Sequence, residues 1–445
     1  MSAQVLSGWG RFPKAASRVL QPRSAAEVAA TSAISAGFIA RGNGRAYGDA
    51  ALGEQSTFEM GALDRVRAFD PETGLVSVEA GVLLSDLIDV FGPRGFFPMV
   101  TPGTRYVSVG GAIAADVHGK NHHRDGGFGD HVTAMTLATP DGEILRLSRE
   151  ENSALFAATV GGMGLTGVIL DATFRLRRIE TGWVRQRTVV APDLSTAIQA
   201  LEAAEGATYS VAWIDCLARG AQLGRSLVYI GEHARRDELD AAAARRPLPL
   251  PSPGRLNVPF DFPDLALNPL SVRLFNALYF AKGAAKTEEQ LTPIGPYFFP
   301  LDGIRGWNRI YGRDGFVQHQ CVLPPQTAES ALGAILERIG WRGEGSFLAV
   351  LKKLGPSATG LMSFPMEGFT LALDFPMRPG LLAFLDDIDK VVVEAGGRLY
   401  LAKDARQSRA TFEAGYPSLV RFRDLRREVD PRSRIQSRLS SRLGL

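Results

Sequence analysis

The chain has 445 residues, of which 45% are hydrophobic and 22% charged, and its net charge at pH 7 is +3. This length predicts two domains with separate cores, and the small net charge, without clustered basic and aromatic residues, gives no support for nucleic-acid binding. No apolar run approaches about 18 residues, and the N-terminus has no continuous apolar stretch, so we expect neither a membrane span nor a signal peptide.

The first predicted element is a helix over residues 24–37, with Ser24 as its N-cap, followed by a short strand that leads into the glycine loop RGNGRAYGD. Further along, hairpins are predicted over 66–81 and 132–148, and helices over 83–92 and 152–160. Ser148 and Glu151 form an S-x-x-E capping box before the last of these helices. Because the strands pair in hairpins and do not alternate regularly with helices, the pattern predicts an α+β fold.

Glycine is concentrated in the first 170 residues, and its clusters favour binding of a large phosphate-bearing cofactor. One cluster, GMGLTG, contains Gly162, Gly164 and Gly167 in the G-x-G-x-x-G spacing of a dinucleotide site. That site needs a strand before the glycines and a helix after them. Here a helix is predicted before and a strand after, so we do not expect a Rossmann site.

Residues 110–123, GGAIAADVHGKNHH, contain His118, His122 and His123. The spacing of His118 and His122 is that of a zinc-binding pair on a helix. However, Gly119 lies between them, H-E-x-x-H is not formed, and neither cysteine is near in the sequence. We therefore expect no metal, and we expect His122 and His123 to be hydrogen-bonded loop residues.

The character of the sequence changes from about residue 182, and the proline-rich residues 247–269 predict a long mobile loop. After it, Leu270, Leu274, Phe275 and Leu278 recur at helical spacing. They indicate either a helix packed on the core or a surface for a lipid tail or a membrane.

The last 25 residues, 421–445, hold eight arginines and three acidic residues, a net charge of +5. This charge indicates either a solvated helix face or attraction to anionic lipid or to a phosphate.

Several motifs, in this order along nearly the whole chain, resemble the vanillyl-alcohol-oxidase type of FAD-binding oxidoreductase: RGNGRAYGD, TPGTRYVSVGGAIAADVHGKNHH, GFGDHV, ATVGGMGLTGVI, WNRIYG, GFVQHQCVLP, SFLAVLKKLGP and GGRLYLAKDAR. The resemblance implies a two-domain α+β fold. Residues 1–181 and 398–445 would form the FAD-binding domain, and residues 182–397 a substrate-binding domain with an antiparallel sheet.

The resemblance also implies an activity. It is FAD-dependent oxidation of the C2' hydroxyl of a polyprenyl-phosphate ribose to the 2'-keto sugar, the first half of an epimerisation that supplies an arabinose donor for cell-wall polysaccharide. An NAD(P)H-dependent short-chain reductase would complete the epimerisation. The enzyme would be cytoplasmic or peripheral at the inner face of the cell membrane. Two alternatives stay open: an oxidase of a free sugar, alditol or aldonolactone, and a non-catalytic flavoprotein that docks the reductase.

Two glycine loops would bring backbone N–H groups onto the FAD pyrophosphate. In many oxidases of this superfamily a histidine bonded to the flavin stands where this chain has Arg45, so non-covalent FAD is implied. The cofactor contacts implied by the resemblance are Arg41, Gly42, Asn43, Gly44, Arg45, Ala46, Tyr47, Gly103, Ser108, Val109, Gly110, Gly111, Ala115, Asp116, Val117, His118, Ile169, Tyr400 and Lys403.

For catalysis the resemblance implies Lys403 as the cation beside the flavin, although a surface lysine paired with Asp404 is the simpler interpretation of that residue alone. The hydroxyl proton could be taken by His118, Lys403 or Tyr47. The implied substrate-binding residues are Gly119, Lys120, Tyr311, Gln318, Gln320, Lys352, Thr370 and Ala372.

Two positions in this set carry further expectations. Gln318 and Gln320 lie two apart on a predicted strand and face one side, so His319 faces the other. Thr370 and Ala372 stand where some members of the family carry asparagine and cysteine, so turnover should not need a thiol at residue 372.

Overall fold

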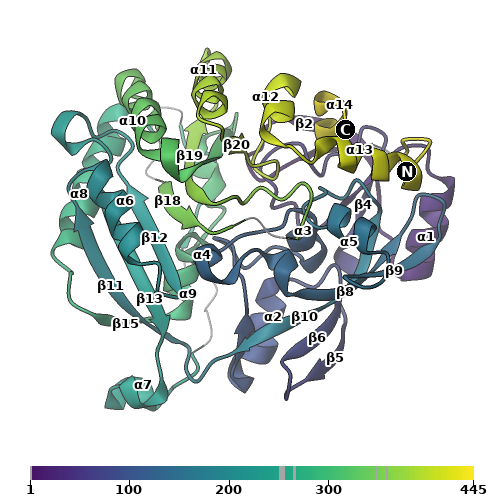
Figure 1. Ribbon diagram of the computed structural model, residues 1–445, viewed down its shortest axis with the longest axis horizontal. Helices are drawn as coiled ribbons and strands as arrows, with labels where there is room; N and C mark the ends of the chain where they lie inside the picture. The colour runs from purple at the N-terminus through teal and green to yellow at the C-terminus, as the bar shows by residue number, and fades with distance from the viewer. Residues whose placement is uncertain (1–2, 250–255, 264–266, 346–347, 357–358) are drawn as a thin grey trace.

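The computed structural model describes residues 3–249, 256–263, 267–345, 348–356 and 359–445. Figure 1 shows two smaller sheets formed by the N-terminal part of the chain, one large sheet formed by the middle part, and C-terminal helices that return to the N-terminal side. The predicted α+β class is confirmed.

The first sheet has four strands in the order β1-β2-β4-β3. Its strands are β1 (Gln4–Ser7), β2 (Lys14–Leu20), β3 (Phe38–Arg41) and β4 (Ser56–Glu59). Helix α1 (Ala25–Ile34) joins β2 to β3 and begins where predicted, because the Ser24 side chain accepts a hydrogen bond from the Glu27 N–H. Strand β3 ends directly at the first glycine loop.

The second sheet has the order β5-β6-β10-β8-β9, and β7 also pairs with β10. Its elements are β5 (Val66–Asp70), β6 (Leu75–Glu79), β7 (Phe96–Pro98), β8 (Val132–Ala138), β9 (Ile144–Ser148) and β10 (Val168–Arg178), with helices α2 (Leu84–Phe91), α3 (Val109–Ala114), α4 (His122–Asp125) and α5 (Ser153–Thr159). Helix α5 precedes GMGLTG and β10 follows it, so the predicted order is confirmed.

The capping box predicted at Ser148 is wrong. Helix α5 begins after Asn152, and the Ser148 hydroxyl accepts hydrogen bonds from the Glu150 and Glu151 N–H groups instead. The Ser148 hydroxyl therefore closes a turn at the end of β9 and does not cap the helix.

The large sheet has eight strands in the order β15-β11-β13-β12-β18-β19-β17-β20, and all its pairs are antiparallel. One face packs against α6 (Leu194–Ala203), α10 (Pro325–Arg342) and α11 (Leu381–Glu394). The strands are β11 (Trp183–Ala191), β12 (Tyr209–Ile214), β13 (Ser226–His233), β15 (Gln290–Pro293), β17 (Phe316–Leu323), β18 (Ala349–Leu354), β19 (Gly368–Pro376) and β20 (Arg398–Leu399). The change of sheet falls between β10 and β11, near the boundary proposed at 181/182.

The C-terminal helices α12 (Arg409–Gly415), α13 (Leu419–Val429) and α14 (Arg438–Leu443) share a core with β3 and β4 (Figure 1). Arg442 pairs with Asp49 at 2.8 Å, and the Arg434 guanidinium pairs with Asp141. Arginines of this segment therefore join it to the N-terminal part, which favours a structural role over an open surface for anions.

Parts of the proline-rich stretch predicted to be mobile, residues 250–255 and 264–266, lie outside the described residues. In the described part, β14 (Leu256–Asn257) pairs with β16 (Ile304–Arg305), and Asp261 forms an ion pair with Arg11 at 2.8 Å. These contacts hold residues 256–263 against the rest of the protein.

Helix α8 (Pro269–Ala284) forms where helical spacing predicted it, and its buried Val272 belongs to the core under the large sheet. The expectation that the leucine stripe faces the core is wrong. Leu270, Leu274 and Leu278 are 77%, 60% and 63% exposed, respectively. The short helices α7 (Ala241–Ala244) and α9 (Ile294–Phe298) flank it in the sequence. In the part of the chain that the structure describes, no helix is long and apolar enough to cross a membrane.

Candidate active site

A cavity of about 830 Å³ lies between the two glycine loops, the histidine-rich stretch and the face of the large sheet that α6, α10 and α11 leave open. This volume is at the upper end of the range of roughly 300–1,000 Å³ for ligand pockets. The predicted residues that line it are Gly42, Asn43, Gly44, Arg45, Ala46, Tyr47, Gly103, Ser108, Gly110, Gly111, Ala115, Val117, His118, Gly119, Lys120, Ile169, Gln318, Gln320, Lys352, Ala372, Tyr400 and Lys403.

Three residues predicted to contact the cofactor lie behind the cavity wall. The Arg41 guanidinium donates to the Ser7 carbonyl at 2.8 Å, and Val109 is fully buried in the core. Asp116 is buried and accepts hydrogen bonds from the Gly129 N–H and the Ser363 hydroxyl. Their side chains support the loops and do not line the cavity.

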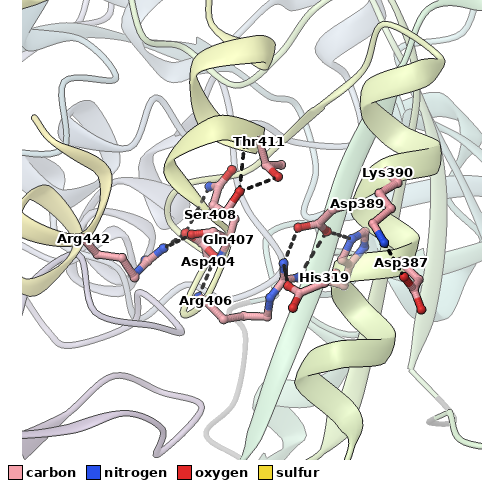
Figure 2. A network of polar contacts seen from close by, with 11 residues as sticks. His319, Asp387, Asp389, Lys390, Asp404, Arg406, Gln407, Ser408, Thr411 and Arg442 are labelled. Atoms are coloured by element: carbon pink, nitrogen blue, oxygen red, sulfur yellow. Dashed lines mark hydrogen bonds and ion pairs between the residues drawn. The ribbon is translucent and has the colours of Figure 1, made fainter.

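Gln318 and Gln320 face the cavity from β17, as predicted. His319 points to the opposite face, where its Nε2 lies 3.0 Å from an Asp389 oxygen on α11. Figure 2 shows this pair together with Arg406, which also bonds Asp389. The prediction that His319 faces the opposite side of the strand from Gln318 and Gln320 is confirmed.

Asp374 is a buried site residue that was missed. It lies directly opposite Gln318 in the β17–β19 pairing and accepts hydrogen bonds from Gln318 at 2.5 Å and from the Tyr311 hydroxyl at 3.1 Å. Burial raises the pKa of the Asp374 carboxyl to about 7. The signal was present, because Thr370, Ala372 and Asp374 share one face of a strand by period-two alternation.

Two predicted substrate residues, Tyr311 and Thr370, therefore act through neighbours. Tyr311 holds Asp374, and the Thr370 hydroxyl lies 3.2 Å from the Gln320 amide. Neither side chain lines the cavity. Thr370 contacts Gln320, which does, and Tyr311 holds Asp374, which in turn binds the cavity residue Gln318.

Lys403 lines the cavity with its ammonium group 3.7 Å from the centre of the Tyr47 ring. Burial lowers the pKa of Lys403 to about 7, while the charge of Asp374 opposes this shift. Asp404 is bound instead by Arg442 at 2.9 Å and by Gln407 at 3.0 Å (Figure 2). The interpretation of Lys403 as a surface lysine paired with Asp404 is therefore wrong.

His118 is buried between two polar side chains. Its Nδ1 lies 3.2 Å from the Lys352 ammonium and its Nε2 lies 3.1 Å from the Gln320 amide. Burial, followed by the charge of Lys352, holds its pKa well below the usual range. A neutral imidazole has one acceptor nitrogen, so Nδ1 accepts from Lys352 and Nε2–H donates to the oxygen of a suitably rotated Gln320 amide.

Lys120 and Lys352 bring further positive charge to the cavity. Burial lowers the pKa of Lys120 to about 7 and that of Lys352 to about 8. Among the described residues neither lysine forms an ion pair with a carboxylate; Lys120 donates to the Tyr297 carbonyl and lies over the Tyr297 ring. Partly buried cations without carboxylate partners indicate an anionic ligand.

Comparisons with known proteins agree with this geometry. Residues 16–148 match the family described as "FAD binding domain". The chain is 39% identical to the decaprenylphosphoryl-β-D-ribose oxidase of Mycolicibacterium smegmatis over 99% of its own length and 97% of the relative. The chain belongs to the family of FAD-binding oxidoreductases that includes this oxidase.

Two further relatives extend the comparison. An uncharacterized protein of Streptomyces coelicolor is 37% identical over 82% of this chain and 100% of its own length. The L-gulonolactone oxidase of Mus musculus is 33% identical, but over only 30% of each chain. The chain is thus an FAD-dependent oxidoreductase, as the sequence motifs predicted.

The glycine loops fit the FAD of this oxidoreductase family. A Cβ added at Gly42 would lie 2.0 Å from the Ser108 hydroxyl oxygen, and Gly44 has a φ of +62°. Ser108 caps α3 by accepting from the Gly111 N–H at 3.3 Å. The two loops therefore pack closely and leave backbone, not side chains, at the cavity wall, which suits a pyrophosphate.

The other histidines of the motif bond to backbone. The Gly355 N–H donates to His122 at 3.1 Å, and His123 lies 2.8 Å from the Ala207 carbonyl oxygen. Burial lowers the pKa of His122 to about 4. The described residues contain no group of three histidine, cysteine or acidic side chains suited to a metal.

Proposed function

We propose that this protein oxidises the C2' hydroxyl of a polyprenyl-phosphate ribose, such as decaprenylphosphoryl-β-D-ribose, to the 2'-keto sugar. The observation that carries the proposal is a pair of lysines, Lys120 and Lys352, that form no ion pair with a carboxylate among the described residues and lie beside a polar wall of Gln318 and Gln320. A phosphate would be held by the lysines and a ribose by the glutamines. The name of the Mycolicibacterium relative supports the same substrate class.

FAD, when bound, accepts the hydride from the C2' carbon. Lys403 takes the hydroxyl proton in this proposal, because a lysine whose pKa is lowered to about 7 is neutral in part of the population and gains a proton readily. The proton then leaves Lys403 as a positive charge on the cavity wall. Asp374 stabilises the protonated lysine.

His118 orients the site and does not act as the base. Its Nδ1 lone pair is occupied by Lys352, and its pKa is too low for efficient proton removal. The Tyr47 ring supports the Lys403 ammonium, and burial raises the pKa of the Tyr47 hydroxyl, so this group stays neutral and serves as a hydrogen-bonding partner of Gln318.

FAD is held without a covalent bond in this proposal. The Arg45 guanidinium lies 4.0 Å from the centre of the Trp9 ring at the position where a flavin-linked histidine is expected in other oxidases. We predict that acid precipitation will release all flavin into the supernatant, because a guanidinium forms no bond to the flavin. A fluorescent protein band after denaturing electrophoresis would contradict this prediction.

The partner enzyme, the membrane contact and the domain boundaries are also part of the proposal. A separate NAD(P)H-dependent short-chain reductase would complete the epimerisation to the arabinose donor, and the protein would contact the inner face of the membrane peripherally. The exposed leucines of α8 support contact with lipid. The domain boundaries at 181/182 and 397/398 are part of the same proposal.

Anaerobic stopped-flow absorbance of the flavin tests the function. We expect farnesyl-phosphoryl ribose to bleach the oxidised flavin and ribitol and L-gulonolactone to leave it unchanged. Bleaching by the free sugar or lactone alone would replace the proposal by a free-sugar oxidase. The similarity to L-gulonolactone oxidase does not favour that alternative, since it is limited to 30% of each chain.

Ala372 offers a separate prediction, because it lines the cavity while Cys216 and Cys321 are buried at 1% and 0% exposure. Burial also raises the pKa of the Cys321 thiol to about 12. Thiol-directed reagents should leave the wild-type enzyme active, whereas Ala372→Cys should be alkylated and inactivated unless substrate is bound. Intact-protein mass spectrometry gives the count of adducts, and inactivation of the wild type with one adduct would contradict the prediction.

A further inference from the structure

The open face of the large sheet changes from polar to apolar across its strands. Strands β17 and β19 present Gln318 and Ala372 to the cavity, and β18 presents Lys352. Val350 is the next residue on the same face of β18, and Leu348, just before the strand, also lines the cavity. Trp213 on β12 lies directly opposite Val350. Neighbouring strands are about 4.8 Å apart. Val350 on β18 and Trp213 on β12 therefore lie two and three strand spacings from the proposed sugar site on β17.

The apolar side of the cavity ends in an aromatic group, which we call the aromatic box: Trp213, Tyr229, Phe275 and Tyr279. All four side chains line the cavity. The Tyr279 ring lies 4.7 Å from that of Trp213 and 5.8 Å from that of Phe275, and its hydroxyl is 3.1 Å from the Tyr229 hydroxyl. Strands β12 and β13 supply Trp213 and Tyr229, and α8 supplies Phe275 and Tyr279.

Helix α8 continues this surface to the outside. Phe275 and Tyr279 form one row along the helix, and Leu270, Leu274 and Leu278 form the adjacent row, because residues four apart lie on the same face. These leucines are 60–77% exposed. Helix α8 contains no acidic residue, and its charged residues are Arg273 and Lys282. A continuous apolar surface therefore runs from inside the cavity to the leucine row.

We infer that the isoprenoid chain of the substrate leaves the cavity through the aromatic box and lies along the leucine row of α8. This inference rests on the proposed function. It fits an amphiphile whose phosphate is at Lys120 and Lys352 and whose tail must leave the cavity on its apolar side. The α8 surface is thus a binding site for the substrate's own tail.

Chain-length dependence tests the inference, with ethyl-phosphoryl ribose and a long polyprenyl-phosphoryl ribose compared in the presence of FAD. The wild type should have a higher kcat/KM for the long-tailed substrate. Leu274→Ser and Leu278→Ser should each lower that kcat/KM about 10-fold, through KM, and leave kcat/KM for ethyl-phosphoryl ribose unchanged. Ile34→Ser, which removes an 85% exposed apolar side chain on α1, is the matched control.

Equal loss on both substrates, or full retention of the long-tail preference in both leucine variants, would overturn the inference. The inference would also be overturned if the leucine variants no longer sedimented with anionic lipid vesicles but kept the long-tail preference. That result would assign α8 to the membrane surface. If neither substrate is oxidised by the wild type, the proposed function fails. If both are oxidised equally well, only the inference fails.

Discussion

Lys403→Met lowers the rate of substrate-dependent flavin reduction by about 10²- to 10⁴-fold, the range expected for loss of a general base. Methionine keeps a similar volume over the Tyr47 ring but cannot take a proton. Anaerobic stopped-flow at saturating substrate measures the rate directly. Lys390→Met is the control, because Lys390 is 70% exposed and paired only with Asp387 among the described ion pairs.

The pH profile distinguishes proton removal from a structural effect. The base must be neutral, so flavin reduction in the wild type should rise as pH increases through about 7, where Lys403 loses its proton. Asp374 raises the pKa of Lys403, so Asp374→Asn should move this rise to lower pH. A profile of flavin reduction that is flat between pH 6 and 9 in the wild type, or that Lys403→Met leaves unchanged, would contradict the role of Lys403.

Lys352→Met should raise KM for a polyprenyl-phosphate ribose about 10- to 100-fold, as expected for removing one charge-assisted contact to phosphate. The maximal rate should fall less, because Lys352 holds the anion and contacts His118 without taking the hydroxyl proton. Steady-state kinetics separate the two effects. Lys353→Met is the matched control, since its ammonium is turned to Glu205 at 3.3 Å.

The charge of Lys352 also gives the direction of a pH effect on KM. Lys352 is protonated below its pKa of about 8 and Lys120 below about 7. The phosphodiester of the substrate keeps its charge in this range, so affinity should fall and KM should rise as pH increases from 7 to 9. Lys352→Met should show a weaker rise. An unchanged KM in this variant would mean that the phosphate binds elsewhere.

Local patterns in the sequence predicted much of the fold. Ser24 capped the expected helix, and the order of elements around GMGLTG excluded a Rossmann site. The helical spacing of Leu270, Leu274 and Leu278 predicted α8, but not its exposure, because spacing identifies an apolar face and does not say what covers it. The partners of that face are set by tertiary packing.

The residues of the candidate site were predicted best where they belong to short continuous sequence motifs. The family resemblance carried by the glycine loops implied most of the cavity wall, and alternation placed Gln318 and Gln320 on one side of their strand and His319 on the other. Asp374 was missed although it lies on the same strand face as Ala372, since its role depends on the facing residue of another strand. The base could not be chosen from the sequence either, because burial and neighbours set the pKa values of His118 and Lys403.

The most direct test of the proposed reaction is to determine which carbon of the substrate is oxidised. Farnesyl-phosphoryl ribose carrying deuterium at C2' should reduce the flavin with a primary isotope effect, and reduction of the product with borohydride should give a mixture of ribo and arabino sugars that lack the label. Retention of the C2' deuterium, with oxidation at another carbon or none, would contradict the proposed activity.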